Sequence, residues 1–184
     1  MNNLKSRLAK EKRFRLYGVA SIILALFLLS LLFVSIFSQG YTAFQETKIQ
    51  LNINFSEEIL DPNKTKDWEI IKKSNFSLLV KNSVNELFPN VSGRSNKRKL
   101  KKIISSSAEY QLRDYVKNNI NTIGKSKKIW VLADDDVDML IKGHINRILP
   151  EDERRIDNEE LKWIEFLESK NLIDKFFNKT FFTS

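Results

Sequence analysis

The chain has 184 residues, with 31 Lys+Arg against 23 Asp+Glu, a formal net charge of +8 and no cysteine. The lack of cysteine excludes disulfide bonds and thiolate metal sites. Six of the basic residues and only one acidic residue lie within residues 1–16, so the basic excess is concentrated before the first apolar segment and does not indicate a nucleic-acid surface.

Residues 16–38 contain no charged side chain and are predicted to form a transmembrane helix. About 20 apolar residues, each rising about 1.5 Å, cross a hydrocarbon core of about 30 Å. A cleaved secretory signal is the alternative interpretation. Its apolar core is usually about 7 to 15 residues long and ends at small residues. The longer apolar segment here, and its end at Ile36 and Phe37, favour a membrane anchor.

The charges that flank this segment predict its orientation. Basic residues stay on the cytoplasmic side of a membrane, and residues 1–15 form a basic tail that we therefore expect to be cytoplasmic. The topology determinants are Lys10, Lys12, Arg13 and Arg15. Residues 39–46 are predicted to be a linker, and residues 47–184 an extracytoplasmic domain.

Small residues inside the predicted span suggest a surface for packing against another helix. Gly18, Ser21 and Ala25 fall close to one helical face. Small side chains allow a second helix to approach closely in a membrane. These three residues are the predicted helix-packing positions.

The rest of the chain predicts helices with a few short strands. Residues 47–55 alternate apolar and polar side chains, which is the period of a strand. The sequence at 61–63 predicts a turn, residues 67–88 a helix that Pro89 stops, and residues 99–120 two helices or one broken helix, with serines 105–107 as a new N-cap.

Further along, residues 128–133 predict a strand. An aspartate among residues 134–136 and Asp157 each predict the start of a helix, because a carboxylate accepts bonds from free backbone N–H groups. Trp163, Phe166 and Leu167 are expected to share one face of the second of these helices. The predicted fold is α+β, with one N-terminal transmembrane helix followed by a mostly helical extracytoplasmic domain with a few short strands.

Two charged clusters are candidate sites. An acidic cluster, at positions 134, 135, 136 and 138, offers oxygen ligands for a divalent cation but lacks the spacing of a calcium loop, so capping of a helix is favoured. A basic cluster offers three alternatives: nucleic acid, an anionic ligand such as phosphate, or a solvated face near lipid headgroups. Its candidate anion-contact residues are Arg94, Lys97, Arg98, Lys101 and Lys102. The predicted topology argues against nucleic acid.

No catalytic, cofactor-binding or metal-binding residue is predicted. His144 is the only histidine, and without cysteine or a paired Ser/Asp arrangement it has no partners for a triad or a zinc site. We therefore expect a protein that is not an enzyme and uses no cofactor.

Six further stretches are considered together: RFRLYG (13–18), SQGYTAFQETKIQL (38–51), LDP (60–62), LFPNVSGR (87–94), IWVLADDDVDMLIKG (129–143) and FFNKTFFTS (176–184). In order and spacing they resemble the N-terminal region of bacterial phosphate ABC-transporter permeases of the PstA type. In such permeases this region would be the first membrane helix and an extracytoplasmic insertion, followed by the remaining membrane helices. The sequence reaches Ser184 without those further membrane helices. The resemblance therefore implies a piece of a permease or an accessory subunit.

The resemblance implies a location and partners. The location is the bacterial inner membrane, with a cytoplasmic N-terminus and residues 47–184 in the periplasm. The partners are a second permease subunit, the ATPase subunit through the rest of the permease, and the periplasmic phosphate-binding protein, and the role is structural or docking in phosphate import. The alternative is a stand-alone single-pass sensor whose outer domain binds an anion, and an Asp-cluster hydrolase is a third hypothesis.

Overall fold

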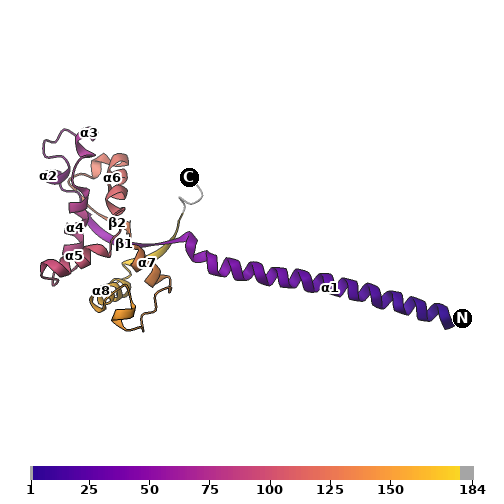
Figure 1. Ribbon diagram of the computed structural model, residues 1–184. Helices are drawn as coiled ribbons and strands as arrows, with labels where there is room; N and C mark the ends of the chain where they lie inside the picture. The colour runs from indigo at the N-terminus through magenta and orange to yellow at the C-terminus, as the bar shows by residue number, and fades with distance from the viewer. Residues whose placement is uncertain (1, 179–184) are drawn as a thin grey trace. The chain divides into compact units, whose positions relative to one another are not determined.

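The computed structural model describes residues 2–178, and the chain divides into two compact units between Phe44 and Gln45. The first unit contains helix α1 (Asn2–Gly40) and a short 3-10 turn, η1 (Tyr41–Phe44). The second begins at Gln45 and contains all the described strands. The fold is α+β: one apolar N-terminal helix precedes a mostly helical domain with a three-stranded sheet (Figure 1).

Helix α1 is continuous and carries a stretch, Lys10–Ser38, that is long and apolar enough to cross a membrane. Within the described residues its large apolar side chains are exposed, Leu24 by 58% for example. The Ser21 hydroxyl donates to the Tyr17 carbonyl at 2.8 Å. The Ser30 hydroxyl likewise donates to the Leu26 carbonyl at 2.8 Å, so these hydroxyls bond within the helix itself, as a polar group surrounded by hydrocarbon must.

Strand β1 (Gln45–Asn54) is the centre of the sheet. It pairs antiparallel with β2 (Ser126–Leu132) on one edge and with β3 (Ile173–Phe177) on the other. Ile49 lies opposite Val131 in one pair and opposite Ile173 in the other. The alternation predicted for 47–55 is confirmed, because the apolar positions from Ile49 to Phe55 are at most 1% exposed while Asn52 and Asn54 face solvent.

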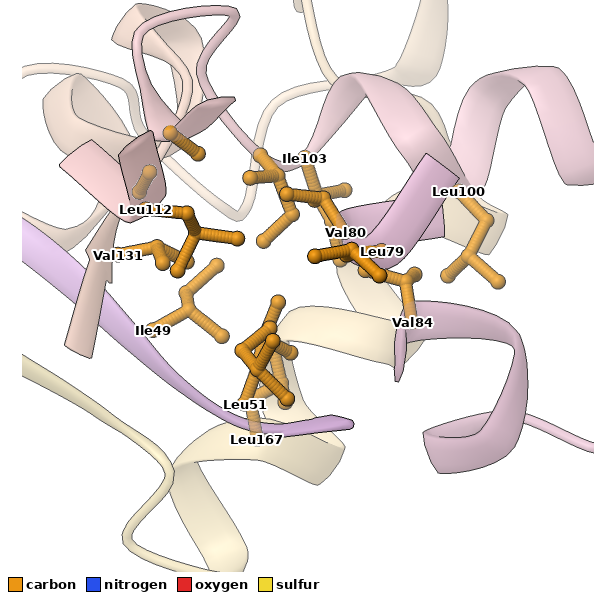
Figure 2. Packing of buried hydrophobic residues seen from close by; sticks show 14 of the residues in the cluster. Ile49, Leu51, Leu79, Val80, Val84, Leu100, Ile103, Leu112, Val131 and Leu167 are labelled. Carbon is orange, nitrogen blue, oxygen red and sulfur yellow. The ribbon is translucent and has the colours of Figure 1, made fainter. Parts of the chain in front are cut away.

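Short helices surround the sheet. Before β2 these are α2 (Glu57–Leu60), α3 (Trp68–Ile71), α4 (Phe76–Leu87), α5 (Arg94–Lys102), α6 (Ala108–Asn118) and the 3-10 turn η2 (Ile120–Thr122). After β2 come α7 (Asp135–Ile141), the 3-10 turn η3 (Glu151–Glu153) and α8 (Asn158–Ser169). Figure 2 shows side chains from β1, β2, α4, α5, α6 and α8 gathered into one apolar cluster.

The prediction of one continuous helix over residues 67–88 is wrong, because the structure has two helices there, α3 and α4. The side chain of Asn75 accepts from the backbone N–H of Leu78 at 3.0 Å and starts α4. The Ser74 hydroxyl donates to the Leu60 carbonyl at 2.9 Å, which holds the turn before it. Polar side chains that bond the backbone locally compete with a continuous helix. The end before Pro89 is confirmed, since α4 ends at Leu87.

The break predicted within residues 99–120 is confirmed, as α5 and α6 are separate helices. The predicted serine cap differs in detail from the structure. The N-cap residue of α6 is Ser107, but within the described residues its side chain makes no capping bond. Its backbone N–H instead donates to the Ser105 hydroxyl at 3.2 Å. Strand β3 was not predicted. Phe176 of this strand packs against Trp130 with ring centroids 4.9 Å apart. Residues 179–184 of the aromatic tail lie outside the described residues.

We expect Leu51→Ala to destabilise the domain by about 2 to 5 kcal/mol, because it leaves a cavity beside the central strand. Asn52→Ala, on the solvent side of the same strand, is the matched control and should change the free energy of unfolding by less than about 0.5 kcal/mol. Urea unfolding of the full chain in detergent micelles, followed by tryptophan fluorescence, measures both, since all three tryptophans follow residue 45. Equal effects of the two substitutions would contradict this packing.

Candidate functional site

Helix α5 carries the basic cluster, and the domain holds it in a fixed orientation. The chain enters it through Gly93 at φ +86°, a backbone conformation that favours glycine. Leu100 is completely buried and fixes which side of the helix faces the core. Beyond the helix, the Ser105 N–H donates to the Leu132 carbonyl at 3.0 Å. The C-terminal end of α5 is therefore tied to the end of strand β2.

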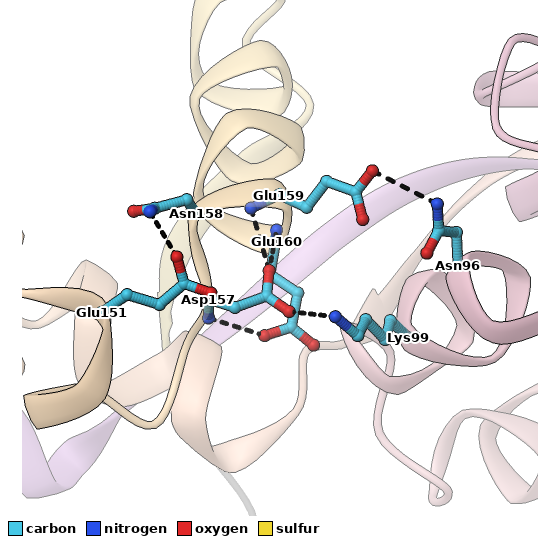
Figure 3. A network of polar contacts seen from close by, with 7 residues as sticks. All are labelled: Asn96, Lys99, Glu151, Asp157, Asn158, Glu159 and Glu160. Atoms are coloured by element: carbon cyan, nitrogen blue, oxygen red, sulfur yellow. Dashed lines mark hydrogen bonds and ion pairs between the residues drawn. The ribbon is translucent and has the colours of Figure 1, made fainter.

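One side of α5 is bonded to the start of α8 (Figure 3). Lys99 Nζ donates to Asp157 Oδ2 at 2.6 Å, and Asn96 Nδ2 donates to Glu159 Oε1 at 3.3 Å. Asp157 also accepts from the backbone N–H groups of Glu159 and Glu160 at 2.9 and 2.8 Å, and the Glu160 side chain accepts from the Asp157 N–H at 3.0 Å. This reciprocal capping box confirms the predicted helix start at Asp157.

The Lys99–Asp157 pair shifts both pKa values in the direction that stabilises the charged forms. The hydrogen bond to Asp157 raises the pKa of Lys99. Burial by itself would raise the pKa of Asp157, but the hydrogen bonds from Lys99 and from the backbone of Glu160 and Glu159 outweigh it, so this pKa is lowered. The pair is partly exposed, at 41% for the lysine and 20% for the aspartate side chain, so its contribution is screened by solvent.

The other side of α5 faces a groove shared with α4. We call it the basic groove; it has a volume of about 440 Å³ and is lined by Lys81, Arg94, Lys97, Arg98 and Lys101. A neighbouring cavity of about 380 Å³ shares two of these cations and adds Lys102, and serine hydroxyls and the carboxylates of Glu109 and Asp134 also line it. Among the described residues, the six cations of the groove and cavity form no ion pair with a carboxylate.

The structure thus brings together the five predicted anion-contact residues, four in the groove and Lys102 in the adjoining cavity. Sequence reasoning missed two contributors on α4: Lys81, and Ser77, whose hydroxyl accepts from Lys101 Nζ at 3.0 Å. Their spacing of four residues, on one helical face, was the available signal. Lys99, in the middle of the basic stretch, faces α8 instead.

The charge pattern of the groove is unfavourable to the isolated helix. Arg94 and Arg98, Lys97 and Lys101, and Arg98 and Lys102 are each four residues apart. Like charges at this spacing destabilise a helix by about 0.2 to 0.5 kcal/mol per pair at low salt. The mutual repulsion of these cations is therefore an unfavourable term in the stability of the fold at low salt.

The acidic cluster caps and tethers helix α7. Asp134 accepts from the Asp136 N–H at 3.2 Å, which confirms the predicted cap. Asp138 accepts from the Thr47 N–H at 2.8 Å and pairs with Lys142 at 2.6 Å. Burial, followed by the charges of Asp136 and Asp135, raises the pKa of Asp134. Within residues 2–178, no group of three or more Asp, Glu or His side chains is placed to hold a metal ion.

The remaining predicted positions lie on α1 and near α7. Gly18, Ser21 and Ala25 lie on exposed α1, and a Cβ added at Gly18 would meet no atom of the described chain within 4 Å. The topology determinants Lys10, Lys12, Arg13 and Arg15 are exposed along the same helix. His144 lies in the turn after α7, where its backbone N–H donates to the Met139 carbonyl at 2.8 Å.

The sequence matches the family described as a domain of unknown function (DUF3333) over residues 1–151. The chain belongs to this family. The matched region contains the apolar helix, strands β1 and β2 and the basic groove, whereas α8 and β3 lie outside it. No curated protein and no solved structure matches the chain. Because β3 pairs with β1, the packed unit of this DUF3333 protein extends past the end of the family match.

We expect Asp157→Ala to destabilise the domain by about 0.5 to 2 kcal/mol, since it removes the cap of α8. Asp157→Asn keeps a good cap but loses the charge that faces Lys99, so at pH 7 and low salt it should cost less, up to about 1 kcal/mol. Asp152→Asn, at an exposed position nearby, is the control and should have no effect. Urea unfolding measures all three.

The loss in the Asp157→Asn variant should depend on pH. Because the pKa of Asp157 is lowered by folding, its contribution is fully present above the ordinary carboxyl pKa of about 3.9 and disappears as the pH falls through the lower folded value. The difference in unfolding free energy between wild type and Asp157→Asn should therefore shrink on acidification. A difference that stays constant down to the lower value would contradict the pairing.

Proposed function

We propose that this chain is the N-terminal, membrane-anchored part of a phosphate ABC-transporter permease subunit. In this proposal α1 is the first transmembrane helix, and the domain from residue 47 is an extracytoplasmic insertion with a structural or docking role in phosphate import. One helix cannot enclose a path for an ion, so the path would be formed by other membrane helices of the transporter. The observation that supports this most is a helix of membrane-spanning length and composition joined to a packed domain.

The positions of the permease-like stretches within the fold support the proposal. Residues 13–18 lie where α1 becomes apolar, and residues 38–51 run from the end of α1 into the central strand. Residues 129–143 cover most of β2, the Asp134 cap and α7. Three of the six similar stretches therefore fall on the anchor, on the segment that leads from it into the central strand, and on the neighbouring strand with the helix that follows it.

The proposed location is the bacterial inner membrane, with a cytoplasmic N-terminus and residues 47–184 in the periplasm. Basic residues precede the apolar stretch of α1, and such residues are retained on the cytoplasmic side. The proposed partners are the second permease subunit, the ATPase subunit through the rest of the permease, and the periplasmic phosphate-binding protein. We propose no catalytic role, because a single histidine and the absence of cysteine leave few groups for acid–base or nucleophilic chemistry.

The topology can be tested with single cysteines, because the natural chain has none. In intact spheroplasts, a membrane-impermeant maleimide should label Ser92→Cys, in the exposed loop before α5, and should not label Asn3→Cys until the membrane is permeabilised. Labelling of Asn3→Cys before permeabilisation, or protection of Ser92→Cys, would overturn the proposed orientation.

The transporter assignment predicts a complex. A tagged chain, expressed in its native host and extracted in mild detergent, should co-purify with a permease subunit and an ATPase subunit, identified by mass spectrometry. Ser21→Leu with Ala25→Leu should lower their recovery, because bulky side chains block close helix approach. Ile23→Phe, on the opposite face of α1, is the matched control. Recovery of the chain without these subunits would refute the assignment and favour a stand-alone membrane sensor.

A further inference from the structure

The basic groove concentrates positive charge that the described part of the fold does not neutralise. Several cations elsewhere in the domain are paired with a carboxylate: Lys142 pairs with Asp138 at 2.6 Å, and Arg147 pairs with Glu168 at 2.7 Å. All five residues that line the groove are Lys or Arg. A concave surface lined by one sign of charge focuses the field and concentrates ions of the opposite sign.

The geometry of the groove favours a small, highly charged oxyanion. Its volume of about 440 Å³ is of the size that small-molecule sites have, about 300 to 1,000 Å³. Arg94 and Arg98 offer planar forks that match phosphoryl oxygens in pairs, and the lysines add point charges. The first turn of α5 contains no acidic residue among those described, so the positive end of the helix adds to the same field.

The neighbouring cavity limits where an anion would bind. Glu109 and Asp134 line that cavity together with Lys102, and their carboxylates repel an anion. They do not line the groove between α4 and α5. The Ser77 hydroxyl lies at the boundary, hydrogen-bonded to Lys101. The anion site is therefore confined to the surface lined by the cations of α5 and Lys81.

We propose that the basic groove binds a phosphoryl oxyanion, either free inorganic phosphate or the headgroup of an anionic phospholipid. The side of α5 that faces α8 is bonded through Lys99 and Asn96, and Leu100 is buried, so the backbone that carries the α5 cations is held in place before any ligand arrives. Such prior ordering lowers the entropic cost of binding. The proposal rests on these charges alone and goes beyond the permease assignment, so it can hold or fail independently of that assignment.

The test uses the full chain carrying Ser92→Cys, labelled with an environment-sensitive fluorophore and reconstituted in nanodiscs. This position is exposed, precedes α5 and lines neither cavity. In one arm, phosphatidylcholine nanodiscs are titrated with inorganic phosphate, with chloride at matched ionic strength as the reference. In the other arm, phosphate is absent and the content of phosphatidylglycerol is varied.

Three sets of substitutions locate the response. Arg94→Gln, Arg98→Gln and Lys101→Gln together remove groove charge, and should weaken the response about tenfold or more for each lost charged contact. Lys97→Arg with Lys101→Arg keeps the charge and should preserve the response. Lys117→Gln, Lys162→Gln and Lys170→Gln remove the same charge as the first set at exposed positions away from the groove, and should have no effect.

The outcomes separate the two sources of the phosphoryl group. A saturable response to phosphate that only the groove substitutions weaken supports a free-phosphate site, and a response confined to phosphatidylglycerol supports a headgroup site. No response in either arm, an equal response to chloride, or an equal loss in the two Gln variants would overturn the proposal. Unfolding midpoints of the Gln variants that match wild type ensure that a lost response reflects lost charge.

Discussion

The pairing of strand β1 on both edges is the constraint on which the rest of the domain depends. Its partners come from residues 126–132 and 173–177, so the sheet exists only when segments more than 70 residues and more than 100 residues away have come together. The apolar face of β1 then receives α4, α6 and α8, which closes the core. In a domain built on such long-range pairs, the loop-closure entropy is lost before those contacts can offset it.

The same strand pairing fixes the basic helix. Ile104, just after α5, forms a bridge with Ala133, and the Asp134 N–H donates to the Ile103 carbonyl at 3.0 Å. The end of α5 is thus bonded to the residues that follow β2, while Lys99 holds its middle to the cap of α8. Because α8 leads directly into β3, both attachments of α5 lead back to the central strand. The orientation of the basic helix therefore depends on both edge strands of the sheet.

Local features of the domain could be predicted from the sequence, and long-range ones could not. The alternation at 47–55 indicates a strand with one buried face, which predicted β1. An aspartate before an apolar run indicates a helix cap, which predicted the starts of α7 and α8. Strand β3 was missed because its five residues carry no clear period and only their pairing with β1 defines them. The break at Asn75 was missed because the apolar stripe continues across it.

The candidate site was predictable only in part for the same reason. The density of Lys and Arg between residues 94 and 102 identifies a charged helix, but it does not show which side each charge faces. Lys99 lies in the middle of this stretch and turns to Asp157, which is 58 residues away in the sequence. Lys81 joins the groove from α4, a different helix. Sequence spacing shows which residues share a face of one helix. Which side chains line a groove between two helices depends on how those helices pack.

Two features of the chain are unfavourable in water and are not compensated within the residues that the structure describes. The apolar side chains of α1 are exposed along a stretch of membrane-spanning length, and burying them requires hydrocarbon or other apolar helices. The cations of the basic groove repel one another, and reducing that repulsion requires anions. Each feature is therefore better explained by surroundings outside the described chain: hydrocarbon or other apolar helices for α1, and anions for the basic groove. The chemistry of the two surroundings differs, which is why the membrane anchor and the groove can be tested separately.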